Sequence, residues 1–93
     1  MKTRWSESAL ADIEELFSYI HERNRAAATA VVDRIEAVAA LLQDFPEAGH
    51  ATDEPGVRMF PVVRYPYLVF YTINASANEV VILHVRHGAQ ERP

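Results

Sequence analysis

Seven side chains in the second half of the chain combine groups that bind phosphate with groups that move protons. They are arginines, tyrosines and histidines: Arg58, Arg64, Tyr67, Tyr71, His84, Arg86 and His87. A guanidinium binds phosphate through charge-assisted hydrogen bonds, and an imidazole or a phenol nearby can give or take a proton. If the fold brings these groups together, they carry the chemistry of metal-free RNA cleavage through the ribose 2′-hydroxyl.

Each of these side chains also has an ordinary structural role open to it. The two tyrosines suit a half-buried strand with their hydroxyls at its rim. His84 is interpreted as a histidine satisfied within a sheet, and Arg58 and Arg64 can pair with acids of the helices, although surface pairs contribute little. His87, next to Gly88 at the end of a strand, is the better candidate for an acid or a base.

The amino-acid composition and the absence of common motifs exclude several classes of function. The chain of 93 residues has no cysteine, so disulfides and thiolate metal sites are excluded. It also lacks a P-loop, a dinucleotide fingerprint, a nucleophile elbow and a His-x-x-x-His metal pattern. We therefore expect no metal and no cofactor.

Charge is unevenly distributed along the chain. The net charge of −4 argues against a strong non-specific nucleic-acid binder, because Lys and Arg supply most of that affinity. Residues 1–55 hold 5 Lys and Arg against 11 Asp and Glu, whereas residues 56–93 hold 4 Arg against 2 Glu. The front half is acidic and the back half is basic.

The length and the N-terminal pattern indicate a single domain over residues 1–93. A chain this long builds one hydrophobic core and not two. The N-terminus leads into a charged amphipathic pattern without an uninterrupted apolar run, so we expect neither a signal peptide nor a membrane span. The expected location is the cytoplasm.

Residues 64–73 form the strand that must position the candidate groups. Side chains alternate between faces, so Leu68 and Phe70 point one way and the tyrosines point the other. A strand that is apolar or aromatic on both faces belongs in the middle of a sheet. Pro66 cannot donate a ladder hydrogen bond, so it must lie near the strand's beginning or at a bulge.

Two further strands are predicted around this one. They cover residues 57–63 and 80–86, and a short turn at 74–78 joins the central strand to the last. Simple alternation places Val81, Leu83 and Val85 on one face of the last strand. It places the other four side chains, Val80, Ile82, His84 and Arg86, on the opposite face.

Two amphipathic helices precede these strands. Ser6 is a good N-cap for a helix from Glu7 to His21, and Asn24 can cap a second helix that stops at Phe45-Pro46. The short connection makes them an antiparallel hairpin. We predict an α+β fold in which this hairpin packs on a three- to four-stranded antiparallel sheet, with residues 3–5 as a strand at its edge.

The order and spacing of short segments along almost the whole chain resemble a toxin of the RelE/ParE superfamily from bacterial type II toxin–antitoxin systems. The segments are Trp5-Ser6, Ala9-Leu10-Ala11-Asp12-Ile13, Tyr19-Ile20, Ala27-Ala28, Phe45-Pro46, Gly49, Gly56-Val57-Arg58, Tyr65-Pro66-Tyr67-Leu68-Val69-Phe70-Tyr71 and Val80-Val81-Ile82-Leu83-His84-Val85-Arg86-His87-Gly88. The resemblance implies a helical hairpin on an antiparallel sheet. It also implies a cognate antitoxin, whose disordered tail folds over the toxin in a hetero-oligomer.

Within this superfamily the resemblance implies two activities. RelE-like members cut messenger RNA on the ribosome, and ParE-like members poison DNA gyrase without a nuclease activity of their own. The nuclease pattern carries over in part, with Arg58 and Arg64 at phosphate-binding positions and His87 as an acid or base. Lys2 is the single lysine, and Gln90 stands where an arginine is expected in related endings.

The acidic balance and the incomplete nuclease pattern favour the ParE-like interpretation. The leading hypothesis is a toxin that inhibits DNA gyrase by binding it. The alternatives are a ribosome-dependent mRNA interferase and a module that only binds its antitoxin, and Gln90 leaves open a weak or inactive toxin. We expect the antitoxin on the open face of the sheet and in the exposed groove of the helical hairpin, and the acidic helices favour basic residues in that partner.

Overall fold

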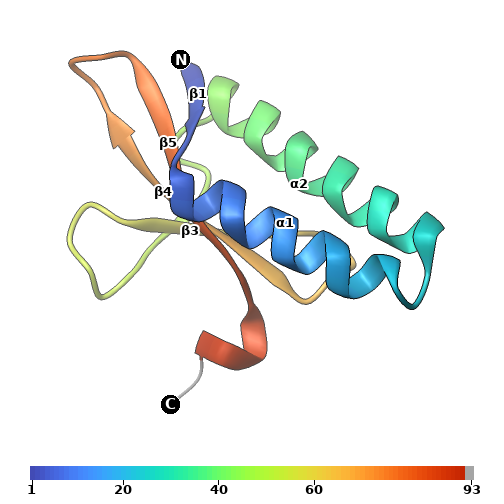
Figure 1. Cartoon of the computed structure of the whole chain (residues 1–93). Helices are drawn as coiled ribbons and strands as arrows, with labels where there is room; N and C mark the ends of the chain where they lie inside the picture. The colour runs from blue at the N-terminus through green and yellow to red at the C-terminus, as the bar shows by residue number, and fades with distance from the viewer. Residues whose placement is uncertain (92–93) are drawn as a thin grey trace.

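Two helices cover one face of a five-stranded sheet, and the opposite face is open (Figure 1). The computed structural model describes residues 1–91, and their side chains as far as Ala89. In chain order the elements are β1 (Lys2–Trp5), α1 (Glu7–His21), α2 (Arg25–Asp44), β2 (His50–Ala51), β3 (Arg58–Pro61), β4 (Tyr67–Asn74), β5 (Glu79–His87) and the 3-10 helix η1 (Gly88–Glu91). The predicted α+β architecture is confirmed.

Both helices begin at the predicted caps. The Ser6 hydroxyl accepts a hydrogen bond from the Ala9 amide at 3.0 Å, and the Asn24 side-chain oxygen accepts one from the Ala27 amide at 3.0 Å. Each bond satisfies an amide that has no partner inside its helix. The bounds of α1 agree with the prediction, and α2 ends at Asp44, directly before Phe45 and Pro46.

The sheet is larger than predicted and is mixed. Its strand order is β1-β5-β4-β3-β2, so β4 lies in the middle as its two apolar faces indicate. β1 pairs with β5 in parallel, from Lys2 opposite Glu79 to Trp5 opposite Ile82, and the other pairs are antiparallel. The expectation of a purely antiparallel sheet was therefore wrong at this edge. β2, for which no strand was predicted, has only 2 residues, too few to show a periodic pattern.

A bulge in β5 changes which side chains share a face. Phe70 pairs with His84, whereas the next residue, Tyr71, pairs with Ile82, so Leu83 is the extra residue. The predicted alternation along β5 is therefore wrong beyond Leu83. Val80, Ile82 and Val85 lie in the buried core, whereas His84 and Arg86 line the open side.

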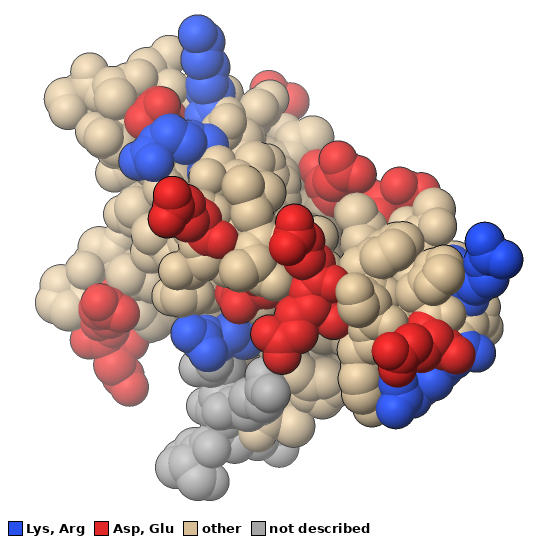
Figure 2. Space-filling model, viewed as in Figure 1, with Lys and Arg blue, Asp and Glu red and all other residues tan. Residues whose placement is uncertain are grey.

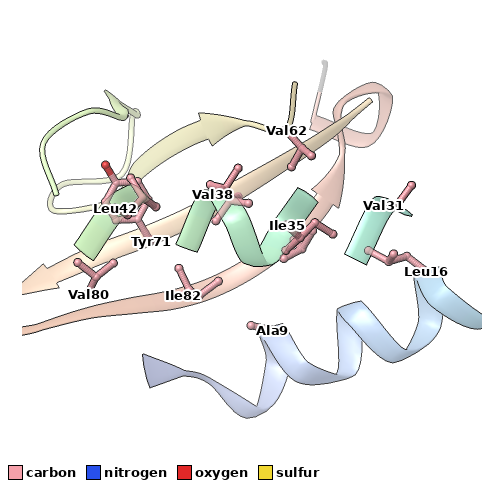
Figure 3. Packing of buried hydrophobic residues seen from close by; sticks show 12 residues of the cluster. Ala9, Leu16, Val31, Ile35, Val38, Leu42, Val62, Tyr71, Val80 and Ile82 are labelled. Atoms are coloured by element: carbon pink, nitrogen blue, oxygen red, sulfur yellow. The ribbon is translucent and has the colours of Figure 1, made fainter. Parts of the chain in front are cut away.

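The core lies between the helices and the covered face of the sheet (Figure 3). Leu16 of α1 and Ile35, Val38 and Leu42 of α2 pack there against the side chains of the central strands. Tyr71 and Val69 of β4 are fully buried, and Trp5 packs against the cluster from the edge. Leu68 and Phe70 lie on the opposite face from Tyr71, as the alternation predicted, and both line a groove on the open side.

Helix α1 replaces a strand along the second half of β5. β1 ends at Trp5, beyond which the Ser6 amide donates to the Ile82 carbonyl at 3.0 Å and the Ser6 hydroxyl donates to the Leu83 carbonyl at 2.9 Å. Further along, the Val85 amide donates to the Asp12 carboxylate at 3.0 Å. Side chains of α1 therefore satisfy backbone groups that would otherwise lack a partner at this edge.

We expect Asp12→Ala to lower the free energy of unfolding by about 1–3 kcal/mol, because it leaves a part-buried amide without its acceptor. Asp12→Asn keeps an acceptor oxygen and should lose less. The measurement is urea denaturation followed by circular dichroism. Glu14→Ala is the matched control, since Glu14 is an exposed acid of the same helix. A loss no larger for Asp12→Ala than for this control would contradict the role of the Val85 contact.

Candidate functional site

Tyr71 fixes the loop that follows α2. Its hydroxyl donates to the Pro46 carbonyl at 2.7 Å and accepts from the Gly49 amide at 2.8 Å. A Cβ at Gly49 would lie 2.5 Å from the same hydroxyl oxygen, so a larger residue does not fit there. Burial raises the pKa of the Tyr71 hydroxyl, and the hydrogen bond from Gly49 and the charge of Arg58 offset part of this rise. Tyr71 is a structural residue.

Arg58 holds the same loop. It lies opposite Tyr71 in the register of β3 and β4, and its guanidinium donates to the Gly49 carbonyl at 2.8 Å and to the Glu47 carbonyl at 3.3 Å. These contacts put the guanidinium at the loop after α2, on the Tyr71 side of the sheet. The hydrogen bonds that a phosphate would need from Arg58 are in part used by the protein itself.

Tyr67 and His87 meet where β4 begins and β5 ends. Their rings make an edge-on contact with 5.5 Å between centroids. The Ala89 amide donates to His87 Nδ1 at 3.1 Å, which leaves Nε2 to carry the proton of the neutral ring. Burial raises the pKa of the Tyr67 hydroxyl, and the nearby Tyr19 raises it further.

His84 lies between a carboxylate and a guanidinium. Its Nδ1 is 3.4 Å from Asp12 Oδ2 and 3.4 Å from Arg86 Nη2. Asp12, whose helical position gave no sign of this role in the sequence, thus contacts both the backbone and a side chain of β5. Its contact depends on the bulge in β5, which no local pattern reveals.

Arg64 lies in the turn between β3 and β4 and adopts the left-handed backbone conformation, with φ of 75°. This conformation costs a residue with a Cβ about 1–2 kcal/mol. The side chain is exposed, and the turn adjoins the end of β5 because the Gly88 amide donates to the Pro66 carbonyl at 2.7 Å. Strained turns of this kind concentrate at functional sites.

The seven candidate side chains do not meet at one point. Arg58 is level with Tyr71 and His87 is level with Tyr67, and these two positions are about 13 Å apart along β4 at about 3.3 Å per residue. Arg64, Tyr67, Arg86 and His87 lie toward one end of the sheet. Tyr71 and Arg58 belong to the structure around the loop after α2.

A groove of about 1280 Å³ runs over the open face of the sheet, and we call it the open groove. Met59, Leu68 and Phe70 line it together with the bulged Leu83. Acidic side chains line part of it through Asp53 and Glu54, and basic ones through His84 and Arg86. A lining of this kind suits an amphipathic segment of another protein.

A second depression of about 680 Å³ lies between α1 and the ends of β4 and β5, and we call it the tyrosine cleft. Asp12, Glu15 and Tyr19 line it from α1, and Tyr67 and His87 line it from the sheet. Tyr67 and Arg86 border both the cleft and the open groove. The two depressions therefore adjoin.

Residues 1–91 contain neither a membrane-spanning helix nor a cluster of metal ligands. Within this range no helix is long and apolar enough to cross a membrane. Nor does any group of three or more His, Cys, Asp or Glu there have the arrangement that could hold a metal ion. The side chain of Gln90 lies outside the described part of the chain, so its effect on activity stays a prediction from the sequence.

The fold matches those of solved bacterial toxins. The chromosomal ParDE toxin–antitoxin system from P. aeruginosa superimposes with a TM-score of 0.73 at 21% identity, over 94% of this chain and 95% of that chain. The isolated E. coli RelE toxin superimposes with a TM-score of 0.66 at 17% identity, over 99% of this chain and 86% of that chain. These likenesses establish the fold.

Sequence comparison establishes the family. Residues 3–92 match the family model described as the ParE toxin of the type II toxin–antitoxin system parDE. A protein of Sinorhizobium fredii carrying the name "Putative toxin Y4kP" is 30% identical over 92 residues, which are 99% of this chain and 93% of that protein. The chain belongs to the ParE toxin family of type II toxin–antitoxin systems, and the predicted kinship is confirmed.

Tyr71→Phe should act on stability and on its pH dependence. It leaves the Gly49 amide and the Pro46 carbonyl without their partner, so we expect a loss of about 1–3 kcal/mol in the free energy of unfolding at neutral pH.

The raised pKa means that the folded protein keeps a proton which the unfolded chain releases from about pH 10, so stability falls above that pH. Tyr71→Phe should make this fall shallower. Urea denaturation between pH 7 and pH 11 measures both effects, and an unchanged slope above pH 10 would contradict the assignment.

Arg64→Gly should stabilise the fold, because glycine adopts the left-handed conformation without the Cβ clash. We expect a gain of about 1 kcal/mol in the free energy of unfolding. The neighbouring exposed Val63 does not have a positive φ, so Val63→Gly should instead be destabilising and serves as the control. Thermal denaturation distinguishes the two, and a loss of stability in Arg64→Gly would count against strain at this turn.

Proposed function

We propose that the protein is a toxin that inhibits DNA gyrase by binding it, and that a cognate antitoxin neutralises it. The observation that carries the choice of gyrase over messenger RNA is the separation of the candidate catalytic groups. Arg58 is bound to the loop after α2, about 13 Å along β4 from the level of His87. Cleavage of RNA requires these groups around one phosphate.

Charge supports the same choice. A nuclease on the ribosome works among phosphates, and a protein of net charge −4 with a single lysine meets a repulsive field there. Four acids lie on α1 alone and no Lys or Arg accompanies them: Glu7, Asp12, Glu14 and Glu15. Binding to a protein target does not need a basic surface.

We place the contact with gyrase at the end of the sheet where the β3–β4 turn adjoins the end of β5. Arg64 extends from the strained turn, and Arg86, His87 and Tyr67 lie beside it on the paired strand ends. Arginine and tyrosine are the residues that most often dominate the energy of protein interfaces. Arg58 and Tyr71 would then affect the target only through the fold.

The antitoxin is assigned to the open groove. An amphipathic segment can place its apolar side chains on Met59, Leu68 and Phe70 and pair its charges with the acidic and basic residues of the lining. Such a segment also covers Arg86, which borders the groove, so the antitoxin would block the target-binding end of the sheet. Toxin and antitoxin would form a hetero-oligomer.

A gyrase supercoiling assay with the purified protein tests the proposal. We expect inhibition of supercoiling without degradation of RNA, and Arg64→Ala and Arg86→Ala should weaken inhibition about tenfold each, as the loss of an interface arginine typically does. Arg34→Ala removes an exposed arginine of α2 that lines neither depression, and should leave inhibition unchanged.

A translating extract run beside this assay tests the alternative. Codon-dependent cleavage of messenger RNA that His87→Gln abolishes would replace gyrase by the ribosome as the target. Absence of growth arrest on induction, with binding of the antitoxin intact, would leave a module that only binds its antitoxin.

A further inference from the structure

The tyrosine cleft has an acceptor that no described residue of the chain uses. Glu15 lines the cleft, and its carboxylate has no hydrogen bond and no ion pair with any residue that the structure describes. The other carboxylate, that of Asp12, is occupied by the Val85 amide and by His84. One carboxylate in a walled depression is therefore available to a donor from outside.

Acidic side chains outnumber the arginines that line the cleft, because Asp12 and Glu15 lie there with Arg86. Carboxylates gather over the middle of the face that carries α1 (Figure 2), and this helix has acids at Glu7, Asp12, Glu14 and Glu15 without any Lys or Arg. A phosphate group would be repelled here, whereas a cationic side chain would be attracted. The excess of acids favours a basic ligand over a phosphate.

Among the basic groups that could occupy the cleft, its aromatic walls favour a guanidinium. The Arg23 guanidinium already lies 3.9 Å from the centre of the Tyr19 ring, which shows the kind of stacking that this wall supports. Tyr67 provides a second ring across the cleft. A guanidinium stacks on tyrosine and binds a carboxylate through two parallel hydrogen bonds, whereas an ammonium has neither the plane nor the fork.

We propose that the tyrosine cleft holds an arginine side chain of the antitoxin, with Glu15 as its carboxylate partner. This inference depends on the proposed antitoxin partner. The cleft and the open groove share Tyr67 and Arg86, so a segment that leaves the groove past these residues reaches the cleft directly. The arginine is an anchor at the end of the apolar contact, and it sets the direction in which the segment lies.

Titration of the purified full-length protein with N-acetyl-arginine amide tests the pocket by itself. NMR shifts of the Tyr19, Tyr67 and His87 ring protons should saturate with this probe, and the isosteric N-acetyl-citrulline amide, which has no charge, should bind at least about tenfold more weakly. Equal binding of the two probes, or shifts confined to other residues, would overturn the proposal.

A matched pair of variants tests the role of Glu15. Glu15→Gln and Glu14→Gln remove the same charge from neighbouring positions of α1, but only Glu15 lines the cleft. We expect Glu15→Gln to lose the arginine probe and to weaken the cognate antitoxin about tenfold, with little change in Glu14→Gln. Equal losses in the two variants would reduce the effect to general electrostatics and overturn the proposal.

The readouts separate this inference from the proposed target. Antitoxin affinity and probe binding are measured without gyrase. If Glu15→Gln selectively weakens binding of the antitoxin while the protein never inhibits supercoiling, the arginine site in the cleft is supported and gyrase is ruled out as the target. If the protein inhibits supercoiling while both variants bind the antitoxin equally, gyrase is supported as the target and the arginine site in the cleft is ruled out.

Discussion

The hydrogen bond between the Val85 amide and the Asp12 carboxylate is the contact on which the proposed functional end of the molecule depends. It lies just past the bulge at Leu83, where β1 has ended and α1 takes its place along that edge of β5. The bulge turns His84 and Arg86 to the open side, and the docked helix forms one wall of the tyrosine cleft. One backbone irregularity thus contributes to the lining of both depressions.

The same arrangement separates residues that hold the fold together from residues that are proposed to contact the target, although the two sets look alike in the sequence. Arg58 and Tyr71 form a structural unit that fixes Pro46, Glu47 and Gly49 to the central strands. Arg64 and Arg86 lie away from that unit, one on a strained turn and one beside His84. Residue type alone could not distinguish Arg58 from Arg64 and Arg86, because an arginine that holds a loop and an arginine on an exposed turn or strand end carry the same sequence signal.

Periodicity predicted the elements well because each has a local cause. The caps at Ser6 and Asn24, the stop at Phe45-Pro46 and the two apolar faces of β4 are written in neighbouring residues. The parallel edge strand, the short β2 and the bulge depend on contacts between distant segments, so no window of sequence contains them. The acidic side of the candidate site was missed for the same reason: Asp12 and Glu15 line the tyrosine cleft because of what lies opposite them in space.

The parallel pairing of β1 with β5 also determines when the sheet can be completed during synthesis. The first strand of the chain has the last one as its neighbour in the sheet, from Lys2 beside Glu79 to Trp5 beside Ile82. During synthesis the N-terminal half must therefore wait, with its apolar surface uncovered, until the final strand has emerged from the ribosome. A nascent chain has no finished sheet and no assembled binding end, which gives a partner already present the first opportunity to capture it.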